Sequence, residues 1–226
     1  MTTDGIPGAG ARRLQGSNPY PWPYDGVVVG NRLALVVVGA QPAWVQRSVG
    51  ADLVLATIER LAVAVRRVGG SVVAVRHAAA TAAQHRIGLP PARESPGWEL
   101  CATTAIFDQV VDAAGINGFT GSPLDGRLRS AGVDHLVLTG FGAEAPVDST
   151  LRAANDRGYE CMVVTDAVAP FDPVTGAAAL SSVTMSGGIF GALATSAELL
   201  DLLATPPAEA AAPRPDSIPN PPVEVP

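Results

Sequence analysis

Short apolar runs alternate with amphipathic segments along this chain. Six runs rich in β-branched residues predict strands, because a strand buried on both faces is apolar throughout instead of alternating. These strands are expected at residues 32–38, 71–75, 109–112, 135–139, 159–165 and 189–195. Segments with apolar positions near the helical period, or with helix-capping residues, predict helices at residues 52–68, 122–130, 173–185 and 196–203. Strands alternating with helices indicate an α/β fold, a three-layer α/β/α sandwich with a mainly parallel, Rossmann-like sheet.

The stretch at residues 134–166 is a complete strand–helix–strand unit. Gly140 and Gly142 allow the chain to turn sharply after the first strand of this unit. Pro146 suits the first turn of the following helix, and Gly158 is a suitable helix stop. Open α/β sheets keep their chemistry where a loop leads from the carboxyl end of a strand into a helix, so this turn is a candidate site.

Composition divides the chain into three parts. Residues 1–17 are polar and glycine-rich and predict a flexible N-terminal arm, residues 18–204 predict a single α/β domain, and residues 205–226 predict a disordered Pro/Ala-rich tail. Residues 18–26 interleave prolines with aromatic residues, which favours an extended segment that packs either on its own domain or on a neighbouring subunit. Residues 77–104 form a long connection without a clear period, as functional lids and interface segments do.

Charge and composition exclude several classes of function. The net charge of −6 and the pI of about 5.0 argue against a nucleic-acid surface. No apolar run approaches the ~20 residues that a membrane span needs, and the first residues lack the apolar core of a signal peptide, so a cytoplasmic location is expected. Cys101 and Cys161 make neither a disulfide framework nor a metal cluster, so we expect no metal. We also expect no cofactor, because the glycines fit no dinucleotide or phosphate fingerprint.

The turn after residue 139 resembles the core of the isochorismatase-like cysteine hydrolases. Their motif there runs roughly Gly-x-x-Thr-x-x-Cys-Val-x-x-Thr, with the cysteine as the nucleophile. Gly140, Val147 and Thr150 match this motif, whereas Ala143 stands at the threonine position and Pro146 at the cysteine position. The resemblance implies the isochorismatase-like hydrolase fold for roughly residues 20–203.

A second matching segment, residues 186–197 (SGGIFGALATSA), is similar to the biuret hydrolase and ureidoacrylate amidohydrolase branch of this family. The family also carries an aspartate after the first strand and a lysine after the third, and the resemblance places Gly39 and Ala113 at these positions. Glycine and alanine move no proton, and Pro146 provides neither a thiol nor an N–H for an oxyanion hole. The resemblance therefore implies no catalytic residue at the three degenerate positions.

The emptied pocket is expected to be lined by residues in or near the loops that lead out of the predicted strands. The candidates are Gln41, Trp44, His77, Trp98, Asn117, Phe119, Glu144, Ala145 and Phe190.

Three functional hypotheses follow. The first is a catalytically inactive homologue that acts as a structural or regulatory subunit, either of a homo-oligomer (a dimer or tetramer) or together with an active relative. The second is an amidohydrolase that cleaves a C–N bond of a biuret-like ureide or amide through non-standard residues such as Cys101, Glu144 or Asp148. The third is a binding protein for a small amide or ureide ligand. None of these involves nucleic acid or a membrane.

Overall fold

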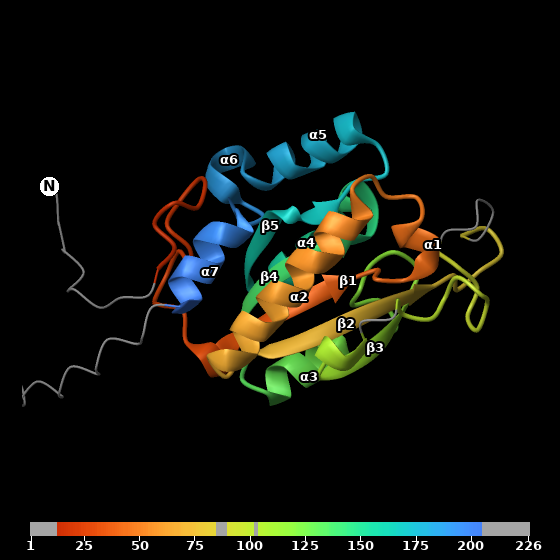
Figure 1. The fold of residues 1–226 in the computed structure, drawn as a ribbon, viewed down its shortest axis with the longest axis horizontal. Coiled ribbons are helices and arrows are strands. Elements are labelled where there is room, and N and C mark those ends of the chain that lie inside the picture. The colour runs from red at the N-terminus through yellow and green to blue at the C-terminus, as the bar shows by residue number, and fades with distance from the viewer. Residues whose placement is uncertain (1–12, 85–89, 102–103, 205–226) are drawn as a thin grey trace, which may run out of the picture.

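The computed structural model describes residues 13–84, 90–101 and 104–204 (Figure 1). A single sheet of six strands lies at its centre, in the order β3-β2-β1-β4-β5-β6, and every neighbouring pair is parallel. The strands are β1 Leu33–Val38, β2 Ser71–Ala78, β3 Gln109–Ala114, β4 His135–Phe141, β5 Glu160–Ala169 and β6 Ala192–Ala194. The predicted α/β fold with a parallel sheet is confirmed.

Helices cover both faces of this sheet. α2 Ala51–Arg67 and α7 Ser196–Ala204 pack on one face, where Ile58 and Leu199 join Leu35 in one apolar core. α3 Leu124–Ser130, α4 Asp148–Asn155 and α5 Pro173–Val183 contribute to a second apolar core on the other face. The remaining helical segments are short: α1 Pro42–Val45, α6 Met185–Gly188, η1 Gly30–Arg32, η2 Thr104–Ile106 and the π-helical turn η3 Ala143–Val147. The molecule therefore has the three layers expected from the sequence.

The N-terminal segment packs on its own domain. Asn18 and Leu193 of β6 exchange backbone hydrogen bonds of 2.9 and 2.8 Å, so this segment adds to the outer edge of the sheet. Trp22 is fully buried, and Leu14 and Ser17 are buried beside it. The packed part thus begins within the predicted arm of residues 1–17, because Leu14 pairs with Trp22. The rest of that arm and the predicted tail lie outside the described residues.

Several element boundaries differ from the predictions. β2 extends through His77, which the sequence analysis placed in a loop. Pro146 lies inside the π-helical turn that precedes α4 and not in the first turn of the helix itself. The last strand has three residues because Ser186 and Gly187 adopt positive φ, which turns the chain before β6 can begin. Within the described residues, no helix combines the length and the apolar character needed to cross a membrane.

Candidate functional site

The strand order brings to one edge of the sheet the three positions at which the resemblance places the family's catalytic residues. Gly39 directly follows β1, Ala113 lies near the end of β3, and Pro146 lies in the turn after β4. β1 lies between β2 and β4, and Ala113 pairs with His77 of β2. Because parallel strands share a direction, all these carboxyl ends meet where ligands bind in open α/β folds.

An aromatic stack occupies the space between Gly39 and the turn after β4. A Cβ atom added to Gly39 would lie 3.4 Å from Cγ and Cδ1 of Trp44. The indole ring of Trp44 stacks on Phe171, with ring centroids 5.7 Å apart and planes 8° apart. A Cβ atom on Gly142 would lie 2.7 Å from Phe171 Cζ and 2.7 Å from Pro146 Cδ. The stack therefore lies between Gly39 and the turn that contains Gly142 and Pro146.

Gln41 is completely buried, and its amide group is fully used by the protein itself. Its Nε2 donates to the carbonyl oxygens of His77 (3.1 Å) and Trp98 (2.6 Å). Its Oε1 accepts from the His77 backbone N–H (2.7 Å) and from Trp44 Nε1 (3.2 Å). Gln41 was expected to line a pocket, but its polar atoms tie the loop after β1 to β2 and to the long connection.

His77 is fully buried beside this brace and is held as a neutral imidazole. Its Nδ1 lies 3.0 Å from the carbonyl oxygen of Gly115, which can only accept, so Nδ1 carries the proton. Burial lowers the pKa of His77 to about 4. The Nε2 atom has no hydrogen-bond partner among the described residues, and the ring meets Trp44 edge-on at 6.0 Å.

The alternative catalytic candidates are engaged in structural contacts. The Glu144 carboxylate accepts from the backbone N–H groups of Phe171 (3.0 Å) and Asp172 (2.9 Å), and so holds the loop that enters α5. Asp148 Oδ2 accepts from Arg152 Nε at 2.8 Å, an i,i+4 pair on α4. Burial raises the pKa of the half-buried Cys101 thiol, which keeps it protonated and weakly nucleophilic.

The other predicted pocket residues divide into two groups. The Trp98 ring is near the site and lies 3.9 Å below the guanidinium of Arg76, and Ala145 lies in the π-helical turn. Asn117, Phe119 and Phe190 are not joined to the stack by any described contact. Asn117 Oδ1 accepts from the Phe119 backbone N–H at 2.9 Å, a local turn contact.

The rings of Phe119 and Phe190 contribute to the second apolar core instead. Phe119 packs 6.0 Å from Tyr159, and Phe190 lies 4.0 Å from the guanidinium of Arg152. Phe171 was missed by the sequence analysis, although its place just after β5 puts it at the same sheet edge.

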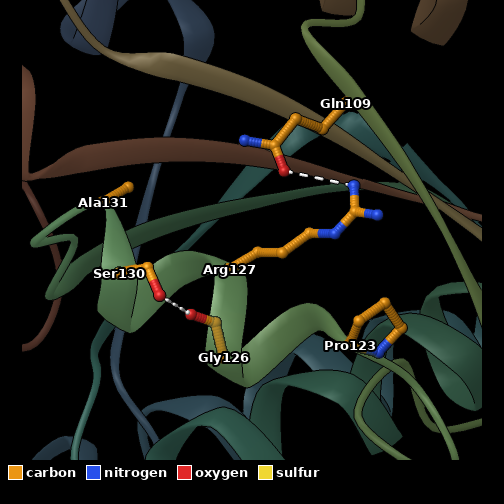
Figure 2. Close-up of a pocket in the computed structure, with 6 residues that line it drawn as sticks. All are labelled: Gln109, Pro123, Gly126, Arg127, Ser130 and Ala131. Atoms are coloured by element: carbon orange, nitrogen blue, oxygen red, sulfur yellow. Dashed lines mark hydrogen bonds between the residues drawn. The ribbon is translucent and has the colours of Figure 1, made fainter.

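An open depression of about 590 Å³ lies at the opposite end of the sheet (Figure 2). It is lined by Gln109, Pro123, Gly126, Arg127, Ser130 and Ala131. Gln109 begins β3, and its Oε1 accepts from Arg127 Nη1 at 3.4 Å. This depression therefore lies at the sheet edge opposite to Gly39, Ala113 and Pro146. Within the described ranges, no group of three or more His, Cys, Asp or Glu residues could hold a metal ion.

Comparison with known proteins identifies the family. The sequence model of the Isochorismatase domain matches residues 33–198. The chain belongs to the isochorismatase family. The predicted resemblance is therefore confirmed, and a ureidoacrylate amidohydrolase is among the relatives.

Two curated relatives of this isochorismatase-family chain have described activities. Streptothricin hydrolase of Streptomyces noursei is 32% identical over 144 residues, which is 62% of this chain and 55% of that protein. The ureidoacrylate amidohydrolase of Enterobacter sp. (strain 638) is 34% identical over 100 residues, 44% of this chain and 42% of that one. The chain thus spans about half the length of these relatives.

Solved structures agree on the fold. A cysteine hydrolase from Pseudomonas syringae pv. phaseolicola 1448A has a TM-score of 0.67 at 23% identity, covering 78% of this chain and 94% of that one. An isochorismatase family protein from Burkholderia thailandensis has a TM-score of 0.66 at 28% identity, covering 77% and 97%.

Proposed function

We propose that this isochorismatase-family protein does not catalyse hydrolysis at the family's site and serves as a structural or regulatory subunit of an oligomer. The observation that carries the proposal is the stack of Trp44 on Phe171, which lies against Gly39 at one end and against Gly142 and Pro146 at the other. This stack supports the proposal because it places two aromatic rings between the positions at which the resemblance puts the family's aspartate and cysteine.

The chemistry required for amide hydrolysis supports the same proposal. A cysteine mechanism needs a thiolate, a group that moves its proton, and donors for the oxyanion. At position 146 the proline offers neither a thiol nor a backbone N–H. The loss of one oxyanion donor alone typically raises the barrier by ~2.7–4 kcal/mol. His77 is a poor substitute base, because its pKa of about 4 leaves it little tendency to take a proton at neutral pH.

A mechanism through non-standard residues finds little support in the contacts. Both oxygens of the Glu144 carboxylate accept hydrogen bonds from backbone N–H groups at the entry to α5. The Cys101 backbone N–H donates to Ala40 at 2.8 Å, which fixes the loop, while its thiol has a raised pKa. No described hydrogen bond joins Cys101 to a base that could activate it.

Ammonia release from biuret, ureidoacrylate and related amides tests the proposal. We expect the purified chain to release no more ammonia than a buffer blank, while a ureidoacrylate amidohydrolase in the same assay releases it readily. Turnover that is abolished by Cys101→Ala or Glu144→Ala, in variants that remain folded, would overturn the proposal. Purification of the tagged chain from its native cells tests the subunit role, and we expect stoichiometric assembly with itself or with a relative.

A further inference from the structure

The two edges of the sheet are covered to different extents. Beyond β6, the N-terminal segment pairs with the sheet, because Asn18 and Leu193 exchange backbone hydrogen bonds. Beyond β3, which pairs with β2, the structure shows no further strand among the residues that it describes. An edge strand presents a row of backbone N–H and C=O groups that can accept another strand. The outer side of β3 is therefore a candidate interaction surface.

The open part of this edge is the first half of β3. Ala114, at the end of the strand, donates its backbone N–H to the carbonyl oxygen of Thr120 at 2.8 Å, so the turn after β3 covers the last residues. Gln109, at the start of the strand, lines the depression whose other wall is α3 (Figure 2). That wall is low at Gly126, where an added Cβ atom would meet nothing within 4 Å. A groove of about 590 Å³ therefore adjoins the open edge.

Arg127 gives this groove a positive charge that no carboxylate neutralises. Its Nη1 donates to the neutral Oε1 of Gln109 at 3.4 Å, and it forms no ion pair with any residue that the structure describes. The carboxylates nearest to it in β3 and α3 are paired with other arginines, in the pairs Asp108–Arg66 and Asp125–Arg129. An acidic side chain from outside the described residues is therefore the complementary partner of Arg127.

Residues 205–226 contain a segment of matching character. They carry three acidic residues against one arginine, a net charge of −2. Residues 221–226 read PPVEVP, in which Glu224 stands between two β-branched valines. Valine favours strands, and successive side chains of a strand point to opposite faces. The flanking prolines cannot donate to a ladder, which limits such a strand to residues 223–225. β6 of this sheet is equally short.

The alternation of these residues fits the two faces of the sheet. Val111 belongs to the second apolar core with residues of α3, so Val110 points to the other face, where it is 37% exposed. When Glu224 points to α3 and Arg127, both valines point to the face on which Val110 is exposed. A slip of one residue would set the valines against the guanidinium instead, so the pattern favours one register.

The connection is long enough for this segment to reach β3. α7 follows β6, the strand farthest from β3, and ends at Ala204. Six strands span about 24 Å at the usual spacing of ~4.8 Å. The 20 residues from Ala204 to Glu224 span up to about 60 Å when extended. Tethering provides an effective concentration in the ~mM range, so a site too weak to recruit a separate peptide can still be filled by this segment.

We propose that residues 223–225 add a short strand to the open edge of β3, with Glu224 paired to Arg127. This contact closes the groove beside α3. It protects the second edge of the sheet with a segment of the same chain, as the N-terminal segment protects the first, and so keeps that edge from pairing with strands of other proteins. The inference does not depend on the proposed lack of catalysis.

Hydrogen exchange of the β3 amides in the full chain, measured by mass spectrometry, tests this contact. We expect Arg127→Glu to raise the exchange rate of β3 about five-fold or more, because exchange follows the fraction of time that the edge is uncovered. Glu224→Arg should have the same effect, and the two substitutions together should restore the slow exchange. Arg67→Glu is the matched control and should leave β3 unchanged. Arg67 is exposed in the last turn of α2, as Arg127 is in the last turn of α3.

The charge swap distinguishes a lost contact from a misfolded variant, because only a lost contact is restored by the second substitution. Equal exchange of β3 in the wild type and in both single variants would overturn the inference, as would an equal effect of Arg67→Glu or a failure of the double variant to recover. Protection of β3 that increases with protein concentration would assign its edge to another molecule and would also overturn it. None of these measurements involves ammonia release, so their failure and that of the proposed function are distinguishable.

Discussion

The indole ring of Trp44 lies nearly parallel to the phenyl ring of Phe171, 5.7 Å away between centroids. Trp44 belongs to α1 after the first strand, and Phe171 belongs to the connection between β5 and α5. The contact joins two loops at the carboxyl edge of the sheet, where ligands bind in open α/β folds. Stacking of this kind contributes about 0.5–1.5 kcal/mol beyond the area that it buries.

Truncation of this stack should be costly. We expect Trp44→Ala to lower the free energy of unfolding by about 3–5 kcal/mol, because a buried ring is replaced by a cavity. Urea denaturation followed by circular dichroism measures the change. Leu53→Ala, at a position that is 77% exposed, should change stability by no more than about 0.5 kcal/mol. Similar values for the two variants would mean that the stack does not hold this edge.

The left-handed backbone conformation of Gly39 should make a side chain at this position destabilising. Gly39 has a φ of +66°, so we expect Gly39→Ala to destabilise the fold by about 1–2 kcal/mol. Gly126 lies inside α3, where an added Cβ would meet nothing within 4 Å. Gly126→Ala should therefore stabilise the protein by about 0.5–1 kcal/mol. The prediction is that the two melting temperatures move in opposite directions, and a shared direction would contradict it.

Gln41 should be needed for folding more than for binding. Gln41→Leu leaves the His77 backbone N–H and the Trp98 carbonyl oxygen without their partner. Each buried group left unsatisfied costs about 1–3 kcal/mol, so we expect a loss of at least about 2 kcal/mol by urea denaturation. Gln46→Leu, at an exposed position just after α1, is the control and should be nearly neutral. A neutral Gln41→Leu would show that the brace is dispensable.

His77 should make stability depend on pH in the acid range. Its pKa falls from 6.5 to about 4 on folding, so the unfolded chain binds a proton between these values and the folded chain does not. Stability from this group is complete above pH 6.5 and is lost as the pH falls towards 4, by up to about 3 kcal/mol.

Comparison with His77→Gln isolates this contribution. Burial also lowers the pKa of His135, so this residue too makes the protein less stable as the pH falls. Its contribution is the same in the wild type and in His77→Gln and cancels in the comparison. We expect the unfolding free energy of His77→Gln to fall less steeply with acid than that of the wild type. Parallel curves would mean that His77 is not held neutral in the fold.

The fold could be predicted because each buried strand appears in the sequence as a short run of apolar residues. The run at residues 135–139 is apolar on both faces of β4, and its place in the chain order is enough to suggest a parallel sheet. β2 was predicted too short because Arg76 and His77 interrupt its apolar run. In the structure Arg76 is paired with Asp112 on the neighbouring strand at 2.7 Å, which neutralises the charge without exposing the strand.

The candidate site was less predictable because its contacts are long-range. The sequence identifies Gly39, Ala113 and Pro146 by their motif positions, and the fold brings them to one edge of the sheet. The sequence does not indicate that Phe171 stacks on Trp44, because no motif near either residue predicts a contact with the other. The sequence places Phe119 and Phe190 in or near loops that lead out of predicted strands. Contacts with residues of the second apolar core determine the positions of their rings in the structure.

The pairing of Asn18 with Leu193 has a consequence for how this protein is made. The two residues lie nearly a whole domain apart in the sequence, yet they share one edge of the sheet. At ~5–20 residues per second, the ribosome emits Asn18 roughly ten seconds or more before its partner exists. The hydrogen bonds that hold Asn18 at the sheet edge can therefore form only after most of the domain has been synthesised, so the part of the domain made first is fixed in place late.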